Sequence, residues 1–454
     1  MHLGYTGLHK TMDKHHYTTI KKARAMAFGR RCESSEAKAL CRRVSHDIQS
    51  LETRKRCRKA IDQIAFDLAV DRIIADLLYA YTGKESKWAY RSLHNDTFIG
   101  EPVKAITFKT IINLMIDLGY VEQRKGGNMS GFNGVSKSGS DKSSYHPGDA
   151  SRFMATRSFI KIANLNGIRV DTINSHIKTV ELSKVVRIRA SSRRSGRTKE
   201  KGRYIVPVEN KTYIEACRRT ESINKYLLKQ SLQGGIFDGY QRLFNEGDRD
   251  DFDFNMGGRL YCLGGESYQS MKKVKRLRML INGNPVVEID VNASYLSILA
   301  SLMGYELDTT RDVYEIEGVH REIVKAWVTA TLGSDVFHGR WPANTVKMLK
   351  EKGIELDRSL SMSIVGERVC ERLPFLSEWE TCGIRWSHLM YQESECIIHA
   401  METLISDFDV PSFGVHDSII VPANKEQLAI RVLKSSYKSL VGAKCRVSVS
   451  RRVN

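Results

Sequence analysis

Apolar residues recur at the spacing of an amphipathic helix in the amino-terminal part of the chain. The pattern predicts one helix over residues 64–81, which stops at Gly83. It predicts a second helix from Thr107, a suitable N-cap, to just before Gly119. The residues before the first helix are rich in Lys and Arg and offer little apolar surface. We therefore expect residues 1–60 to form a basic arm without a fold of its own.

A strand pattern follows the second helix. The stretch YVEQRKGG, residues 120–127, predicts one strand, and RFMAT, residues 152–156, predicts another that leads into a helix starting at Thr156. A Gly/Ser-rich stretch, residues 126–149, joins them. Helices followed by a hairpin with a long, polar, basic tip resemble a winged helix. Residues 61–170 are thus expected to form a winged-helix-like nucleic-acid-binding domain, with a winged helix that binds no DNA as the alternative.

Residues 171–254 are expected to form a basic connector or thumb-like region. Within it, RIRASSRRSGRTKEKGRY, residues 187–204, contains eight Lys or Arg and one Glu among small polar residues. We expect a solvated loop there, because contacts to a phosphate backbone need charge and little shape.

The charge of the chain is unevenly divided. Residues 1–254 hold 46 Lys and Arg against 28 Asp and Glu, whereas residues 255–454 hold 25 against 24. The net charge of +19 therefore lies almost entirely in the first part. This uneven distribution indicates that the first part of the chain binds an acidic polymer and that the second part performs the chemistry. A basic surface that only keeps the protein soluble is the alternative.

The composition argues against membrane and disulfide-rich classes. No stretch approaches the ~18 consecutive apolar residues of a membrane span, and the first residues lack the apolar core of a signal peptide. The nine cysteines are scattered, with no C-x-x-C pair, which argues against a disulfide framework and against a zinc knuckle. We expect no membrane partner and reduced thiols in a cytoplasm, either bacterial or that of a host cell.

Two Asp residues lie beside apolar strands in the second half. Asp290 follows the apolar run VVEI and precedes a predicted helix, and Asp417 lies at the bend of SFGVHDSIIVP. Each residue alone fits a helix cap or a turn. Two such carboxylates brought together repel each other unless cations lie between them. That arrangement is typical of two-metal phosphoryl transfer, with Mg²⁺ ions ~3.5–4 Å apart.

A basic helix is predicted between the two acids. The stretch HREIVKAWVTATLG, residues 320–333, places Arg321 and Lys325 one turn apart and so on one face. A bound triphosphate would convert their mutual repulsion into attraction, whereas a solvated surface is the alternative explanation.

The segments EIDVNASYLSIL, REIVKAWVTATLG and VHDSIIVPA resemble, in this order, the palm and fingers motifs of single-subunit nucleic-acid polymerases. The likeness is strongest to family A DNA polymerases and the related phage-type RNA polymerases. It extends to GGRLYCLGG and to SECIIHAMETLISDFDVPSFGVHDS. The resemblance implies a mixed α/β (α+β) fold, in which the winged-helix-like domain precedes a right-hand polymerase palm and fingers domain at residues 255–454.

The resemblance also implies roles for single residues. Asp290 and Asp417 would hold two Mg²⁺ ions, with Mn²⁺ as a substitute, and the backbone carbonyl of Val291 would be a further ligand. Lys325 and Arg321 would bind the phosphates of the incoming nucleotide and stabilise the developing pyrophosphate.

Two further roles follow from the same resemblance. His416 would lie near the primer terminus. Arg259, in GGRLY, would lie close to the template and nascent strands, with a surface residue of a hairpin as the alternative.

Tyr295 bears on the choice between DNA and RNA synthesis. It lies five residues after Asp290, where family A DNA polymerases have a Glu that crowds the ribose 2′-OH and phage-type RNA polymerases have a small residue. The stretch DVNASYLSI also resembles the corresponding motif of family B DNA polymerases, in which a Tyr excludes the 2′-OH. Tyr295 therefore favours dNTPs, unless the ring only fills the core.

The sequence departs from the family pattern in the fingers motif. Leu332 precedes Gly333 where relatives have Tyr-Gly, so the ring that stacks at the templating position is missing or comes from elsewhere, and low fidelity is expected. No convincing D-x-E strand motif precedes residue 255, and we expect no proofreading exonuclease.

The expected function is a template-dependent DNA polymerase or primase-polymerase that replicates a plasmid, phage or other mobile element, with primed DNA and dNTPs as partners. An RNA polymerase or primase that uses NTPs is one alternative. A non-catalytic DNA-binding replication initiator is another. The sequence leaves open the mode of initiation, the DNA sequence recognised and the oligomeric state.

Overall fold

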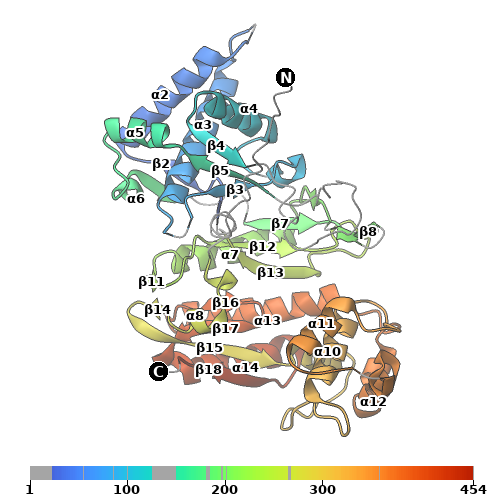
Figure 1. Cartoon of the computed structure of the whole chain (residues 1–454). Helices are drawn as coiled ribbons and strands as arrows, with labels where there is room; N and C mark the ends of the chain where they lie inside the picture. The colour runs from blue at the N-terminus through green and yellow to red at the C-terminus, as the bar shows by residue number, and fades with distance from the viewer. Residues whose placement is uncertain are drawn as a thin grey trace, which may run out of the picture. The chain divides into compact units, whose positions relative to one another are not determined.

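The computed structural model describes residues 23–54, 56–84, 86–99, 101–124, 150–179, 185–195, 198–200, 202–263, 267–356 and 358–452. The chain forms two compact units (Figure 1). The first contains residues 1–184 with 263–270, and the second contains residues 185–262 with 271–454. Both units are mixed α/β structures with small sheets.

The first unit has a four-stranded sheet of order β1-β3-β5-β4 and a separate β2–β6 pair. In the sheet, β5 pairs antiparallel with both β3 and β4, and β1 joins β3 in parallel. Buried side chains of the helices and of these strands share one core. The elements are β1 (Arg24–Ala25), β2 (Arg30–Cys32), α2 (Ser35–Leu51), α3 (Ala60–Tyr81), β3 (Ala89–Arg91), η1 (Asn95–Phe98), α4 (Ala105–Asp117), β4 (Val121–Arg124), β5 (Ser151–Ala155), α5 (Arg157–Leu165), α6 (Ile173–His176), β6 (Ile177–Thr179) and η2 (Tyr268–Ser270).

The expectation that residues 1–60 form an arm without a fold is wrong for the described residues 23–54. Helix α2 is capped by Ser34, whose hydroxyl accepts a hydrogen bond of 3.1 Å from the amide of Ala37. Its residues Leu40, Val44 and Ile48, spaced four apart, are fully buried in the core of the unit. Lys and Arg on the opposite face of α2 conceal this stripe in the sequence. Residues 1–22 lie outside the described part.

The two helices predicted next are present, as are the two strands. Helix α4 begins at Ala105, and its N-cap is Lys104, three residues before the N-cap expected at Thr107. Gly119 follows α4 with φ +69°, and the helix expected to start at Thr156 is α5, which the hydroxyl of Thr156 caps. The predicted hairpin tip, residues 126–149, lies outside the described residues.

The second unit has two larger sheets, of order β10-β7-β12-β13 and β11-β14-β15-β17-β16, and β18 pairs with β15 in the latter. Its elements are β7 (Val186–Arg189), β8 (Arg193–Ser195), β9 (Thr198–Glu200), β10 (Tyr204–Ile205), α7 (Lys211–Leu227), β11 (Leu232–Gln233), β12 (Tyr240–Phe244), β13 (Gly257–Cys262), α8 (Lys273–Arg276), β14 (Leu280–Ile281), β15 (Asn284–Asn292), α9 (Ser294–Leu302), α10 (Arg321–Leu332), α11 (Ala343–Glu351), η3 (Arg358–Leu360), α12 (Met362–Arg372), η4 (Pro374–Glu378), α13 (Trp386–Ser406), β16 (Phe413–Val415), β17 (Ser418–Pro422), η5 (Ala423–Lys425), α14 (Glu426–Val441) and β18 (Arg446–Ser450).

Strand β15 is central in its sheet, because over Glu288–Asp290 it pairs with β17 on one side and with β18 on the other. Val287, Ile289 and Val291 are buried and alternate with Glu288 and Asp290, which therefore share the opposite face of the strand. Helices α13 and α14 pack against each other and both contact β17 (Figure 1). The central position fixes the backbone beside Asp290 from both sides.

Residues 185–254 are not a connector. They supply β7, β12 and α7, and β12 pairs with β13 in the four-stranded sheet of the second unit. The basic segment 187–204, expected to be a loop, contains most of β7 and the hairpin β8–β9. The boundary expected at residues 254/255 thus falls inside a compact unit, because the polar surface of these strands resembles that of a linker in sequence.

Among the described residues, none of the helices combines the length and the apolar character that a membrane crossing requires.

Candidate active site

The two candidate carboxylates are neighbours at one end of the β15–β17 pair. Asp290 lies opposite Ser418 in the antiparallel register. The amide of Val291 donates a hydrogen bond of 3.1 Å to the backbone carbonyl of Asp417. The predicted approach of Asp290 and Asp417 is therefore present, although they are far apart in sequence.

A tight hairpin holds Asp417. Strands β16 and β17 are buried along their whole length, and the pairing of Val415 with Ser418 leaves a two-residue turn, His416 and Asp417. His416 has φ +53°, a left-handed conformation that costs energy for a residue with a side chain. Its ring centroid lies 5.9 Å from that of Tyr261 on β13. Backbone pairing on both sides of the turn thus fixes the position of the carboxylate.

Asp417 lies among other negative charges. Burial raises the pKa of its carboxyl to about 6, and the carboxylates of Glu393 and Asp290 act in the same direction. The guanidinium of Arg259 opposes them without cancelling the effect. Ionised Asp417 is therefore destabilised, and a cation bound beside it would be stabilised.

The glutamate beside Asp417, Glu393, lies on α13 and is 2% exposed. It forms an ion pair with Arg259 of β13, whose Nη2 also donates to the hydroxyl of Tyr295 at 3.3 Å. The buried Nε of Arg259 has no hydrogen-bond partner among the described residues. Burial, followed by the charges of Glu393 and Asp417, raises the pKa of Tyr295, so this phenol is neutral. The predicted residues Arg259 and Tyr295 therefore contact each other, and Glu393 joins them electrostatically to Asp417.

Asp290 has a basic partner within the protein, which the sequence analysis did not anticipate. Lys273 of α8 forms an ion pair with its carboxylate and lies 3.8 Å from Glu288. Arg276, also of α8, donates to both oxygens of the buried Glu288 at 2.7 and 2.9 Å. The acidic face of β15 is thus matched by the basic residues of α8.

Helix α10 displays Arg321 and Lys325, both exposed, on its surface as predicted. Arg321 is ion-paired with Asp312 and Glu322, and its guanidinium lies 5.4 Å from the ring centre of Tyr314. Burial raises the pKa of Tyr314, and the negative charges of Asp312 and Asp417 act in the same direction. Lys325 forms no ion pair with any described residue. Among the described residues, Arg321 forms its ion pairs with Asp312 and Glu322, and neither Arg321 nor Lys325 pairs with Asp290 or Asp417.

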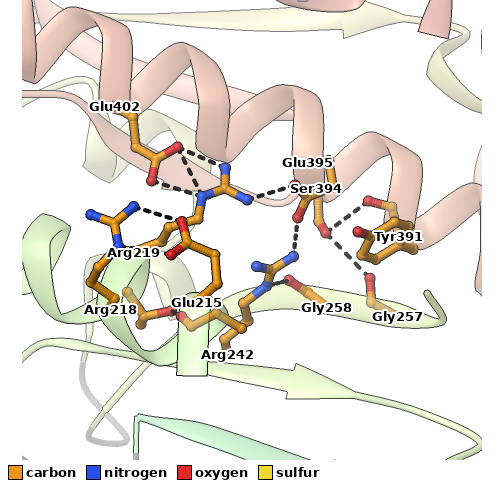
Figure 2. Close-up of polar contacts among 12 residues, drawn as sticks. Glu215, Arg218, Arg219, Arg242, Gly257, Gly258, Tyr391, Ser394, Glu395 and Glu402 are labelled. Atoms are coloured by element: carbon orange, nitrogen blue, oxygen red, sulfur yellow. Dashed lines mark hydrogen bonds and ion pairs between the residues drawn. The ribbon is translucent and has the colours of Figure 1, made fainter. Parts of the chain in front are cut away.

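Ion pairs also tie α7 and β12 to α13 (Figure 2). Arg219 of α7 bridges Glu395 and Glu402, with a distance of 2.7 Å to each. Arg242 of β12 pairs with Glu395 and donates to the carbonyl of Gly258 at 2.9 Å. Gly258 directly precedes Arg259, so this network fixes the backbone of the strand that presents Arg259.

The sequence analysis missed Glu393, Lys273 and Tyr314. Glu393 had a visible signal, because it lies in the stripe Leu389–Glu393–Ile397 of an otherwise apolar helix face. Lys273 belongs to the run KKVKRLR, in which nothing distinguishes it from its neighbours. Tyr314 precedes α10 in an irregular segment, where spacing gives no guide to contacts.

Comparisons with known proteins leave the family open. No protein-family model matches the sequence, and no curated protein matches it. One similar solved structure is described as the POL domain of Pol1 from M. smegmatis in complex with DNA primer-template and dNTP. The identity is 11%, the match covers 58% of this chain and 57% of that chain, and the TM-score is 0.30. A score this low supports no argument about fold or function.

Proposed function

We propose that this chain is a nucleotidyltransferase, and specifically a template-dependent DNA polymerase without proofreading. The observation that supports it is the hydrogen-bonded register of β15 and β17, which brings Asp290 and Asp417 together on rigid strands. Acids in this arrangement are unfavourable for a protein that only needs stability, because their charges repel each other in a partly buried site.

Two divalent cations fit the charges of the site. Asp290, Asp417 and the backbone carbonyl of Val291 would hold Mg²⁺, or Mn²⁺ in its place, since hard cations prefer oxygen ligands. The pKa of Asp417 is raised first by burial and then by the charges of Glu393 and Asp290, and a bound cation would stabilise the ionised carboxylate against both effects. When bound, the ions would supply charge stabilisation to the attacking and leaving oxygens.

Other residues are assigned to the substrates. Arg321 and Lys325 would bind the triphosphate, which requires Arg321 to exchange Asp312 for phosphate oxygens. Tyr295, which accepts a hydrogen bond from Arg259, would exclude the 2′-OH of an NTP, and Arg259 would lie close to the template and nascent strands. His416 would lie near the primer end.

The first unit is proposed to bind DNA as a winged helix. Its order α3, β3, η1, α4, β4, β5 and its antiparallel arrangement β3-β5-β4 support this assignment. The excess of basic residues before residue 255 supports contacts to phosphates. An origin in a plasmid, phage or other mobile element stays a prediction from the sequence.

A DNA-binding protein without catalysis is the second candidate, and the ion pair between Lys273 and Asp290 favours it. A lysine on a candidate metal ligand neutralises that ligand without any cation. Lys273 is, however, 40% exposed, and an exposed ammonium group exchanges partners at a cost of only ~1 kcal/mol.

Primer extension tests the proposal. The protein would be incubated with Mg²⁺, a primed DNA template and either dNTPs or NTPs. Extension with dNTPs is expected, together with a loss of several orders of magnitude in both Asp290→Asn and Asp417→Asn and unchanged DNA affinity. Asp407→Asn, an exposed acid after α13, is the matched control and is expected to be active. No extension by the wild type, with tight DNA binding, would establish the second candidate, whereas a preference for NTPs would indicate an RNA polymerase.

A further inference from the structure

Two cysteines and an aspartate converge in the first unit, whereas the site described above is built by residues of the second unit. Cys32 ends β2, Cys41 lies on α2 and Asp71 lies on α3. One ligand atom from each lies within 4.8 Å of the others. The three residues come from three different elements, so the tertiary fold brings them together. The two cysteines do not form a C-x-x-C pair, so the sequence pattern does not predict the cluster.

The contacts inside this cluster leave its polar groups poorly satisfied. Cys32 is 2% exposed, and its thiol points to the backbone oxygen of Asp71 at 3.8 Å. The thiol of Cys41 lies 3.9 Å from Oδ1 of Asp71. Thiols are weak hydrogen-bond donors, and both contacts are long. Within the part of the chain that the structure describes, the carboxylate of Asp71 accepts one hydrogen bond of normal length, 3.0 Å, from the amide of Cys32.

Asp71 is partly buried and forms no ion pair with any described residue. Burial raises the pKa of its carboxyl, although Arg72 and Arg31 act against the shift. The neighbouring Cys32 thiol has a pKa well above its usual value, because of Cys41 and burial. In a buried cluster of thiols and a carboxyl group, the ionised forms are unfavourable as long as no cation is present. A divalent cation that replaces the protons stabilises these ionised forms.

We infer that Cys32, Cys41 and Asp71 bind a zinc ion. Zinc accepts thiolate and carboxylate ligands together, and a tetrahedral site with Zn–S bonds of ~2.3 Å holds its ligand atoms ~3.6–3.8 Å apart. The 3.9 Å between Cys41 Sγ and Asp71 Oδ1 is close to this spacing. Other metals fit this set of ligands less well. Mg²⁺ and Ca²⁺ prefer oxygen ligands to thiolates, and an iron–sulfur cluster is typically held by four cysteines.

The surrounding charges match such a site. Two thiolates and one carboxylate around Zn²⁺ leave one net negative charge, and the guanidinium groups of Arg72 and Arg31 lie near enough to offset it. The fourth position would belong to water or to a small ligand. The ion would link β2 and α2 to α3, the long helix of the unit, and would therefore stabilise the first unit.

Zinc content of the full-length protein tests the inference. After dialysis against zinc and then against metal-free buffer, the wild type is expected to retain stoichiometric zinc. Cys32→Ser, Cys41→Ser and Asp71→Asn are each expected to lose it, with affinity lowered by at least ~100-fold. Cys57→Ser, at an exposed cysteine of the same unit, is the matched control and is expected to retain it. The double variant Asp290→Asn/Asp417→Asn is also expected to retain it, which separates this site from the proposed active site.

Cobalt provides a readout that does not depend on whether the variants fold. Co²⁺ added to the wild type is expected to give the thiolate-to-metal absorption of a tetrahedral site, and a chelator is expected to remove it and to lower the Tm. Zinc retention equal in the wild type and in Cys32→Ser would overturn the inference. The absence of a thiolate–cobalt band in the folded wild type, or a Cys32–Cys41 disulfide in protein kept under reductant, would also overturn it.

Discussion

The amide of Val291 donates a hydrogen bond of 3.1 Å to the carbonyl of Asp417. This single bond joins the end of β15 to the turn of the β16–β17 hairpin. It holds the Asp290 and Asp417 side chains on adjacent backbone segments, so their distance from each other depends on backbone pairing more than on side-chain flexibility.

Replacement of Asp417 by Asn is expected to stabilise the protein in the presence of a chelator. The folded pKa of Asp417, about 6, is above the ordinary value of 3.8, so its ionisation costs folding stability. This cost in folding free energy grows as the pH rises from ~4 to ~6 and is constant at higher pH. Above pH ~6, the free energy of unfolding of the variant is therefore expected to exceed that of the wild type by roughly 1–3 kcal/mol.

Urea unfolding of the wild type and Asp417→Asn at two pH values measures this difference. The two proteins are expected to unfold at similar urea concentrations near pH ~4, and the variant at higher urea near pH ~7.5. A wild type that gains stability relative to the variant as the pH rises would contradict the charge environment described for Asp417.

Removal of the ammonium group of Lys273 is expected to lower the Mg²⁺ concentration needed for activity. Lys273→Met keeps the length of the side chain and removes the cation that competes for Asp290. An ion pair this exposed is worth ~0.2–1 kcal/mol, which corresponds to a decrease of about 1.4- to 5-fold in the half-saturating concentration. Lys275→Met, at an exposed position of the same helix, is the matched control. A higher Mg²⁺ requirement in Lys273→Met would show that Lys273 assists substrate binding.

Neutralisation of Glu393 is expected to destabilise the second unit. Glu393→Gln leaves the largely buried guanidinium of Arg259 without its counter-charge, and loss of one member of a buried pair costs about 3 kcal/mol. Urea unfolding of this variant is to be compared with that of Glu371→Gln, at an exposed glutamate of α12. Equal stability of the two variants would mean that Arg259 finds another partner.

The ring of Tyr295 is expected to determine the choice of sugar. Tyr295→Ala opens space beside the nucleotide and is expected to reduce discrimination against NTPs by at least about tenfold, or ~1.4 kcal/mol. Tyr295→Phe loses only the contact with Arg259 and keeps the volume of the ring, so it is expected to discriminate nearly as well as the wild type. The ratio of kcat/KM for dNTPs and NTPs on one primed template measures both. An unchanged ratio in Tyr295→Ala would assign the ring to packing alone.

The sequence predicts those parts of the fold in which local pattern and tertiary environment agree. The apolar run before Asp290, the helix of Arg321 and the hairpin around Asp417 are all present, because each has a period that a single element can satisfy. The pairing of β15 with β17 was not predicted, since local patterns contain no information on which strands pair; the family resemblance implied only that Asp290 and Asp417 hold the same metal ions.

Charged residues account for most of what the sequence failed to predict. In α2, basic side chains on the exposed face concealed a buried stripe, and the many basic residues of the segment 187–204 concealed strands that are part of a compact unit. Lys273 and Glu393 were missed because their partners, Asp290 and Arg259, lie on other elements. The pairing of a buried charge is a tertiary property, and spacing along the chain does not reveal it.

Strand β18 has a consequence for how the protein is made. It pairs with β15 from Glu288 to Asn292, on the side opposite to β17. A ribosome must therefore translate beyond Ser450 before the strand of Asp290 has both neighbours, and until then one edge of β15 is open to pairing with another chain. Truncation before residue 446 would leave every proposed active-site residue in the polypeptide, and we expect it to abolish the rigid placement of Asp290 nonetheless.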